Sequence, residues 1–387
     1  MNKQTVVIKI GSSSLTQATG EVSLSKLEQM VEHVRDIKKA GYRVVIVSSG
    51  AVACGFRLLG LSRRPQSIRE KQAAAAVGQG ISIQHYRNLF QNNGIEVAQV
   101  LLNRSDFSDR KRYMNVLNTL SLLLDRDIVP IINENDSVAV EEIRWGDNDF
   151  LAAQVAGLLQ AEWLVLVTSA DGVYTEDPSV DPLAEPIPYL HSVSKELLEQ
   201  LGPTHSKFGT GGMRSKLEAA RHATGFGTDV YVGTAKQDVG WLLDVLQGKG
   251  TGTYIGTKEI PPSRKHQWIG FHSELSGRLT VDDGAKRALE LEHRSLLPCG
   301  VIRVDGEFQP GEVVEVVSLS GRTLGRGVVN LSAKMLEQVK GLQTQEMLSA
   351  GWQVPSEEVI HRDNWVQQIE HGGGAEYERS SNEGDAG

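Results

Sequence analysis

Two lysines of this 387-residue chain lie at positions from which they could bind an anion, one in a predicted strand and the other in a predicted helix. Lys9 interrupts the apolar segment VVIKI and precedes Gly11, and Lys216 falls in the first turn of a helix predicted after FGTGGMRS. An ammonium group within an apolar strand is costly to bury unless it has a partner. Glycine lets a phosphate approach the backbone closely. Alternatively, Lys9 lies in solvent on an edge strand and the glycine loop is merely mobile.

Three strand or loop segments could bind an anion or a nucleotide. The glycine loop FGTGGMRSKLEAA at 208–220 fits neither the Walker A nor the dinucleotide pattern, although its N–H groups at a helix N-terminus could hold a phosphate. VIVSSGAVACG at 45–55 leaves backbone N–H and hydroxyl groups free to bind an anion, and VTSADGVYTEDP at 167–178 ends a strand in a polar turn that could meet an adenine base. Taken singly, each could also be an ordinary connection.

Two further segments, IINENDSV at 131–138 and RWGDNDFLAA at 144–153, gather amide and carboxylate side chains at predicted strand and helix ends. Carboxylates suit an ammonium group, whereas amides and hydroxyls suit a carboxylate, so this composition predicts recognition of a zwitterion. A solvated loop or a helix N-cap is the alternative. The residues concerned are Asn133, Asn135, Asp136, Asp147, Asn148 and Asp149.

Apolar strand candidates alternate with amphipathic helix candidates through the first two thirds of the chain. The strands are predicted at 5–10, 43–48, 97–102, 128–132, 163–168 and 228–233. The helices are predicted at 25–40, 68–90, 113–124, 149–159, 213–223 and 239–246. Strands that are apolar along their whole length are typical of a parallel sheet covered on both faces. The pattern therefore predicts an α/β sandwich with right-handed crossovers.

The pattern changes after residue 259. Residues 260–274 predict a linker with paired prolines and mixed charge, and residues 275–353 predict a small, mostly β domain with one helix at 283–289. Residues 354–387 predict an acidic tail that has little to bury and is largely disordered. Residues 1–259 would then form the first domain.

The net charge of −8 is concentrated near the end of the chain. Residues 355–387 carry eight acidic and two basic side chains, which leaves −2 for the remainder, and residues 275–350 carry nine basic and ten acidic side chains. This distribution argues against binding to nucleic acid or anionic lipid.

Cys54 and Cys299 are far apart, which predicts two buried thiols in a reducing compartment. Without a signal-peptide core or a membrane-spanning apolar run, we expect a cytoplasmic protein.

Taken in order, strand-Lys-Gly-Ser, SSGA, NEND, GDND, DGVYTxDP and GTGGMxxK resemble the amino acid kinase family, and residues 295–316 are similar to a PUA domain. The resemblance extends to about residue 365. It implies an α/β fold, a parallel-sheet αβα sandwich of the amino acid kinase type, followed by a PUA-like β domain. The INEND and GDND pair further implies ATP-dependent phosphorylation of the side-chain carboxylate of L-glutamate. The product would be L-glutamyl 5-phosphate, in the first step of proline biosynthesis.

Carried over by motif position, the resemblance implies that Lys9 and Lys216 face the transferred phosphoryl group and that Asp149 positions both. The implied glutamate contacts are Ser49, Asp136 and Asn148, with Asn133 and Asp147 beside them. The implied ATP-binding residues are Lys9, Gly11, Thr168, Ser169, Thr210, Gly211, Gly212, Met213, Arg214, Ser215 and Lys216. The chain departs from the family at Ser169, where aspartate is common, and at Arg214 and Ser215, where smaller or threonine residues are common.

A side-chain carboxylate with an ordinary pKa near 4.3 is already ionised at neutral pH, so the reaction needs no general base. The difficulty is to bring an anion up to a polyanion, and we expect catalysis by positioning and charge neutralisation. Mg²⁺ would come with the ATP phosphates, without a metal ligand among the side chains. The resemblance also implies proline as a feedback inhibitor, a homo-oligomer, and hand-off of the labile product to the next enzyme.

Three alternatives remain open from the sequence. The chain could be a sibling kinase that acts on acetylglutamate, aspartate, carbamate or UMP, although the INEND and GDND pair disfavours this. It could be an RNA-binding factor, because PUA-like domains occur in RNA-modifying enzymes, but the near-neutral C-terminal domain lacks the expected basic face. It could also be an inactive protein of the same fold, although every expected catalytic position carries a chemically competent residue.

Overall fold

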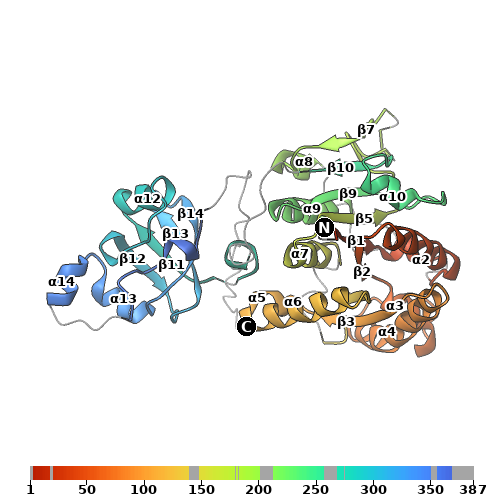
Figure 1. Ribbon diagram of the computed structural model, residues 1–387, viewed down its shortest axis with the longest axis horizontal. Coiled ribbons are helices and arrows are strands. Elements are labelled where there is room, and N and C mark those ends of the chain that lie inside the picture. Colours follow the sequence, from red (N-terminus) through yellow and green to blue (C-terminus); the bar gives the residue numbers. More distant parts are fainter. Residues whose placement is uncertain are drawn as a thin grey trace, which may run out of the picture.

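The structure is a computed structural model that describes residues 3–17, 21–138, 148–178, 180–181, 183–200, 212–256, 268–273, 275–349 and 355–367. Two separate main sheets organise these residues, with a short helical turn between them (Figure 1). The larger sheet belongs to the N-terminal part and carries the residues predicted to do chemistry. The smaller sheet is built entirely from the C-terminal part.

The larger sheet has eight strands in the order β3-β4-β2-β1-β5-β9-β10-β8. Their bounds are β1 Thr5–Ile10, β2 Arg43–Ser48, β3 Val97–Leu102, β4 Val129–Glu134, β5 Trp163–Thr168, β8 Tyr189–Leu190, β9 Asp229–Thr234 and β10 Thr253–Ile255. All neighbours pair in parallel except β9 and β10, which are antiparallel. The six predicted strands all exist, and two of them lie one or two residues further along the chain.

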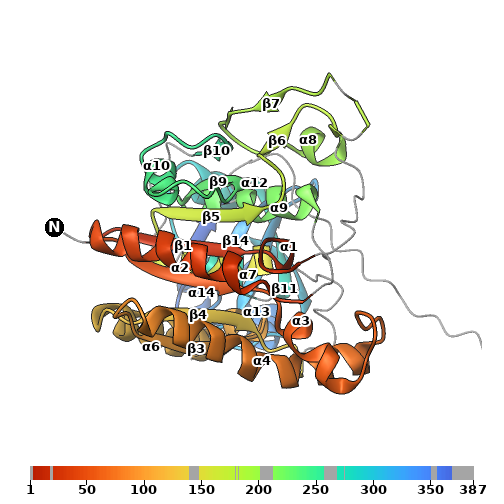
Figure 2. The same ribbon diagram turned by 90° about the vertical axis from the view of Figure 1, so that its right-hand side faces the viewer.

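Helices cover both faces of this sheet and make it the middle layer of an αβα sandwich (Figures 1 and 2). One apolar core contains side chains of α2, α4 and α10, and the other contains side chains of α6, α7 and α9. The bounds are α2 Leu24–Lys39, α4 Ile68–Gln91, α6 Arg110–Asp125, α7 Asn148–Leu159, α9 Met213–Gly225 and α10 Trp241–Leu246. The fold class predicted for the N-terminal part is therefore confirmed.

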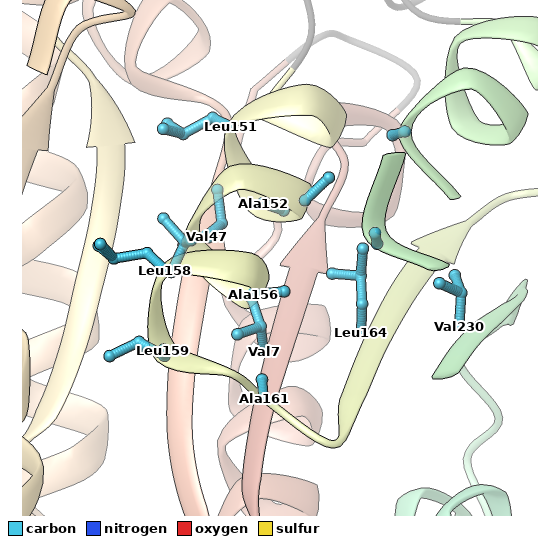
Figure 3. Close-up of a cluster of buried hydrophobic side chains, with 14 of the residues drawn as sticks. Val7, Val47, Leu151, Ala152, Ala156, Leu158, Leu159, Ala161, Leu164 and Val230 are labelled. Carbon is cyan, nitrogen blue, oxygen red and sulfur yellow. The ribbon is translucent and has the colours of Figure 1, made fainter. Parts of the chain in front are cut away.

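Alternation along β1 decides which layer receives Lys9. Val6, Ile8 and Ile10 belong to the core on the α2 side, whereas Val7 belongs to the core on the α7 side. Since side chains of a strand alternate between its faces, Lys9 shares the α7 side with Val7. Figure 3 shows α7 lying against this face of β1, with apolar side chains between them.

Several short elements connect the main ones and were not predicted. They are α1 Ser12–Leu15, α3 Ala51–Gly55, η1 Phe56–Leu59, α5 Ser105–Ser108, α8 Lys195–Gln200 and the hairpin of β6 Val173–Tyr174 with β7 Pro186–Ile187. β8 and β10 were missed as well, because strands of two or three residues are too short to show a period of two. These short elements mostly follow the ends of sheet strands.

The smaller sheet has the order β12-β11-β13-β14-β15, and only β11 and β13 pair in parallel. Its elements are β11 Leu275–Val281, α12 Asp283–Glu290, η4 Pro298–Gly300, β12 Val301–Gly306, β13 Val313–Ser318, β14 Thr323–Val328, α13 Ala333–Val339, α14 Thr344–Ser349, η5 Arg362–Asn364 and β15 Trp365–Gln367. The mostly β domain predicted here is confirmed, with two more helices than the one expected.

Two expectations for the segments around this domain need correction. Part of the expected linker forms a helical turn, η3 Trp268–His272, and buries Trp268 and Ile269 in the core that includes α7. The expected tail begins too early, because β15 pairs with β14 and Val359 and Ile360 are buried in the core of the β domain. Residues 355–367 contain apolar side chains that become buried, which the acidic composition of the whole segment did not indicate.

The cysteine prediction was also wrong in part. Both cysteines are free thiols, but Cys54 is half-buried and Cys299 is exposed. Within the described ranges, no helix is long and apolar enough to cross a bilayer.

Candidate functional site

A buried carboxylate lies between the two lysines that the sequence singled out. Asp149 Oδ1 is 2.5 Å from Lys9 Nζ, and Asp149 Oδ2 is 3.0 Å from Lys216 Nζ. The side chains are 0%, 3% and 8% exposed for Asp149, Lys9 and Lys216 respectively. We call these three residues the charged centre. The structure thus brings all three expected catalytic residues together, from β1, α7 and α9.

Local sequence explains how each charge arrives there. Alternation along β1 turns Lys9 toward α7, and Asp149 occupies the first turn of α7, where the helix dipole favours a negative charge. Most of the remaining α7 side chains are apolar and buried, although Phe150 is exposed and Gln154 is polar, and this burial holds the helix across the sheet. Gly157 permits close contact with α9, because a Cβ atom there would meet the Phe226 ring at 2.3 Å. Lys216 therefore comes within reach of Asp149.

The charged centre carries two positive charges and one negative charge. Burying charges without compensation is costly, and one aspartate offsets only one of two ammonium groups. Two ammonium groups held side by side in a buried site make it suitable for an anion. Ser215 lies at its edge, with Oγ 2.9 Å from Gly212 O and 3.4 Å from Asp149 Oδ2.

Next to the charged centre, four polar side chains form a hydrogen-bonded chain that we call the amide network: Ser49, Asn148, Asn133 and Gln79. Asn148 Nδ2 donates to Ser49 Oγ at 3.1 Å and to Asn133 Oδ1 at 2.8 Å, and it also lies 2.8 Å from Ser48 O. Asn133 Nδ2 in turn donates to Gln79 Oε1 at 2.7 Å. The Asn148 side chain thus does not cap the helix, as the alternative proposed. It takes part in hydrogen bonds that connect α7 with β4, α4 and the end of β2.

The amide network ends at a cavity of about 310 Å³. The cavity is lined by α4, by β3 and by the chain that follows β4, and its wall includes Gln79 and Asp136. Asp136 is half-buried, and burial raises the pKa of its carboxyl group from 3.8 to about 6. A carboxylate that is poorly solvated in this way favours a cationic partner, which would stabilise its charged form.

The expected nucleotide residues that the structure describes follow two neighbouring strands and begin α9. Gly11 follows β1, and a Cβ atom at this position would lie 3.5 Å from Val167 O and 3.7 Å from Lys9 Nζ. Thr168 is buried at the end of β5, and Ser169 after it is exposed. These positions therefore meet at one edge of the sheet, as the carboxyl ends of parallel strands do.

The remaining nucleotide positions lie at the N-terminus of α9. Gly212 and Met213 are half-buried, while exposed Arg214 pairs with Glu218 at 3.1 Å rather than with the charged centre. Thr210, Gly211 and Asp147 lie outside the described residues.

Sequence reasoning missed Gln79. It lies inside the predicted helix at 68–90, between Gly78 and Gly80, and periodicity alone gave it no role. A polar residue between two glycines, shortly after a run of four alanines, was the available signal. The structure shows the rest, because Asn133 is distant in sequence and reaches Gln79 only through the strand order of the sheet.

The carboxylate of the charged centre is occupied by the two lysines and not by a metal-binding cluster. Both oxygens of Asp149 are engaged by lysines. Among the described residues, no group of three His, Cys, Asp or Glu side chains could hold a metal ion.

Comparison with known proteins gives two family matches along the chain. The amino acid kinase family matches residues 4–233, and the PUA domain matches residues 277–349. The first match covers the sheet with the charged centre, and the second covers most of the smaller sheet.

Individual proteins are similar over nearly the whole chain. Glutamate 5-kinase of Bacillus cereus (strain G9842) is 46% identical over 369 residues, covering 95% of this chain and 100% of its own length. Glutamate 5-kinase of Geobacillus kaustophilus (strain HTA426) is also 46% identical, covering 95% and 98% respectively. Among solved structures, carbamate kinase from Giardia lamblia bound to AMP-PNP is 15% identical, covers 66% of this chain and 99% of its own, and has a TM-score of 0.49.

Proposed function

The chain belongs to the amino acid kinase family, and we propose that it transfers the γ-phosphoryl group of ATP to the side-chain carboxylate of L-glutamate. The reaction forms L-glutamyl 5-phosphate and ADP, the first step of proline biosynthesis. A carboxylate oxygen of glutamate forms the new bond to the γ-phosphorus, and the bond between that phosphorus and the bridging oxygen of ADP breaks. Similarity to glutamate 5-kinases over 95% of the chain supports this substrate.

The single observation that carries the proposal is the pair of buried lysines held by one buried aspartate. Lys9 and Lys216 would neutralise the oxygens of the transferred phosphoryl group, and Asp149 would hold both ammonium groups in position before the substrates arrive. Preorganised charges in a site that excludes water stabilise a transition state more strongly than solvent can. No general base is required, because the acceptor carboxylate is already ionised at neutral pH.

We assign glutamate binding to the amide network and the cavity beside it. The Ser49 hydroxyl oxygen accepts a hydrogen bond from Asn148, so its own proton can be donated to a carboxylate of the substrate. The Asp136 carboxylate would pair with the substrate's ammonium group. Asn133 and Asp147 remain proposed neighbours of this subsite, Asn133 because it bonds to Asn148.

We assign nucleotide binding to Gly11, Thr168 and Ser169 at the strand ends and to residues 210–216 around the start of α9. Lys9 and Lys216 belong to this set and to the charged centre alike. Mg²⁺ bound to the ATP phosphates would neutralise part of their charge, while the protein side chains hold and orient the phosphoryl group. Exposed Ser169 and the Arg214–Glu218 pair are the places where this assignment departs most from the family pattern.

The proposal is tested by ADP release from Mg-ATP with glutamate, acetylglutamate, aspartate or UMP, in the presence of hydroxylamine. Glutamate-dependent ADP release with trapped hydroxamate is the expected result, because hydroxylamine captures an acyl phosphate. Turnover with a different substrate would keep the charged centre and overturn the specificity. ADP release without hydroxamate would contradict transfer to a carboxylate.

We further propose that the protein is cytoplasmic, forms a homo-oligomer, is inhibited by proline and passes its labile product to the next enzyme of the pathway. The C-terminal β domain would support assembly or regulation. Removal of the chain after Gly270 should then change the oligomeric state measured by light scattering, or the proline concentration that halves activity. A truncated protein with both properties unchanged would contradict a role of this domain in either.

A further inference from the structure

The orientation of every amide in the amide network follows from one backbone atom. Ser48 O can only accept a hydrogen bond, and it lies 2.8 Å from Asn148 Nδ2. Turning the Asn148 amide around would place its own oxygen against this carbonyl, which is repulsive. Asn148 therefore donates from Nδ2, and Asn133 must accept with Oδ1, which lies 2.8 Å from Asn148 Nδ2.

The orientation of the Asn133 amide in turn fixes the orientation of the Gln79 amide. Because the Asn133 oxygen is used by Asn148, its Nδ2 faces Gln79 and requires an acceptor there, which Oε1 supplies at 2.7 Å. The Gln79 amide consequently has its Nε2 end left over. Among the residues that the structure describes, Nε2 has no other hydrogen-bond partner, and Gln79 forms part of the cavity wall.

Close helix packing fixes the backbone that carries Gln79. At the crossing of α3 and α4, a Cβ atom on Gly78 would lie 1.8 Å from Ala51 O, and one on Gly55 would lie 2.0 Å from Ala74 O. The two glycines let the helices touch backbone to backbone, so α4 cannot shift without breaking this contact. Gln79 directly follows the crossing and is held beside the loop that contains Ser49.

The cavity therefore combines two opposite demands. Asp136 and Glu134 contribute carboxylates to its lining, and Gln79 offers N–H groups that cannot be exchanged for an acceptor. An α-amino acid end group has an ammonium and a carboxylate on one carbon and satisfies both at once. A ligand with only an ammonium group would leave the Gln79 donors unpaired, which is costly in a poorly solvated site.

We propose that Gln79 determines specificity for the α-amino acid end of the substrate by donating from Nε2 to the α-carboxylate, while Asp136 binds the α-ammonium. This inference rests on the proposed function, since it assigns the α end of the same glutamate molecule. The reacting side-chain carboxylate then lies toward Ser49 and the charged centre. The amide network links the two ends, because its first and last members each contact one of them.

The test compares L-glutamate with 4-aminobutanoate, which keeps the ammonium and the reacting carboxylate but lacks the α-carboxylate. Q79E retains an acceptor for Asn133 and replaces the donors with a negative oxygen, so the network stays intact. We expect kcat/KM for glutamate to fall about 10- to 100-fold, mainly through KM, the range for one hydrogen bond to a charged group. The value for 4-aminobutanoate, or its inhibition constant if turnover is too slow, should change less than about threefold.

Two matched variants separate the proposed role from a general effect of added charge. Gln84 is exposed on the same helix and bonds Asn88, so Q84E should behave as the unaltered protein. Gln99 lines the same cavity from β3, so Q99E adds the same charge at another point of its wall. The KM for ATP and the melting temperature of Q79E should stay unchanged.

Equal losses for both ligands in Q79E, no loss for either, or the same selectivity change in Q99E would each overturn the role of Gln79. In all three cases the unaltered protein still phosphorylates glutamate, so the proposed function stands. Failure of the unaltered protein to form hydroxamate from glutamate would instead overturn the proposed function, and this inference with it.

Discussion

The charged centre and the amide network are neighbours, yet they differ in burial and in the kind of interaction that holds them. Asp149, Lys9 and Lys216 are almost completely buried and paired by charge. The amide network runs outward from buried Asn148 to half-buried Gln79 at a cavity, and neutral hydrogen bonds hold it together. Electrostatic interactions strengthen as water is excluded, whereas neutral amides provide direction more than energy.

This difference suggests a division of labour between the two regions. Rigid, buried charges act on a transition state in which charge is redistributed, so they should govern kcat. Directional amides and the half-buried carboxylate of Asp136 act on a bound molecule that has not yet reacted, so they should govern KM and selectivity. The following variants test whether the division holds.

The largest effect is expected from Asp149→Asn, which removes the negative charge from between two buried lysines. Leaving buried charges without their partner typically costs about 3–5 kcal/mol of stability. Activity should fall by at least the 10²–10³ typical of one lost preorganised donor, because both lysines lose their anchor. Urea denaturation and the hydroxamate assay measure the two effects.

Asp125→Asn provides the matched control for that variant, because Asp125 pairs with Arg43 at the surface, at 3.4 Å. A surface pair contributes about 0–1 kcal/mol, so this control should stay close to the unaltered protein. If Asp149→Asn were no less stable than the control, the charged centre would not depend on its carboxylate.

Lys216→Ala should keep the fold and lower kcat about 10²- to 10³-fold, because a preorganised positive charge is lost from the transition state. KM for glutamate should change much less. Steady-state kinetics with both substrates would separate the two parameters, with Lys249→Ala as an exposed control. A kcat within tenfold of the unaltered value would remove Lys216 from the catalytic role and break the proposed division.

Asp136 should affect KM, in a manner that depends on pH. Burial raises the pKa of this carboxyl to about 6, so below pH 6 it becomes protonated and can no longer pair with an ammonium group. KM for glutamate should rise up to about tenfold for each pH unit below 6, with kcat much less affected. Asp136→Ala should have a high KM at all pH values, without this dependence, and an unchanged KM would exclude Asp136 from the substrate site.

The same carboxyl group should affect stability and substrate binding in opposite ways. Its ionisation at higher pH favours glutamate binding but lowers the stability of the folded protein. Its pKa is higher in the folded protein than the ordinary value of 3.8, so the unfolded chain loses the proton first as pH rises. Asp136 therefore costs increasing stability between about pH 4 and 6, and the full cost is present above pH 6. At pH 8, Asp136→Asn should be at least as stable as the unaltered protein in thermal denaturation.

The larger sheet was predictable because its strands are apolar along their length and separated by long amphipathic helices. Short elements such as β10 and β15 were not, since three residues show no period and their pairing depends on distant partners. The end of the β domain was misplaced for a related reason. Val359, Ile360 and Trp365 are buried, but they lie in a segment whose overall composition is acidic.

For the site, sequence motifs brought together residues that are far apart in the chain. Lys9, Asp149 and Lys216 were predicted as a group through a resemblance, and their alternation and helix positions explain why they meet. Gln79 escaped because its role depends on a relay of hydrogen bonds through Asn133, which no single motif contains. The direction of these hydrogen bonds can be worked out only from the structure, because a sequence does not show which way each amide side chain is oriented.

The smallest effect is expected from Tyr86→Phe, beneath the amide network. Ser48 Oγ donates its one proton to Ser49 O at 3.1 Å, so the Tyr86 hydroxyl must be the donor in its 2.7 Å contact with Ser48 Oγ. Removing this buried hydrogen bond should cost about 1 kcal/mol of stability. The carbonyl of Ser48 would still orient Asn148, so KM for glutamate should stay within about twofold.

Urea denaturation and steady-state kinetics on the same preparation of Tyr86→Phe would measure both quantities. A tenfold or larger rise in KM would mean that the amide network draws its orientation from the side chains below it and not from the Ser48 carbonyl. The boundary between the two regions would then lie deeper in the sheet, because a residue of the apolar core on the α2 side would contribute to substrate binding.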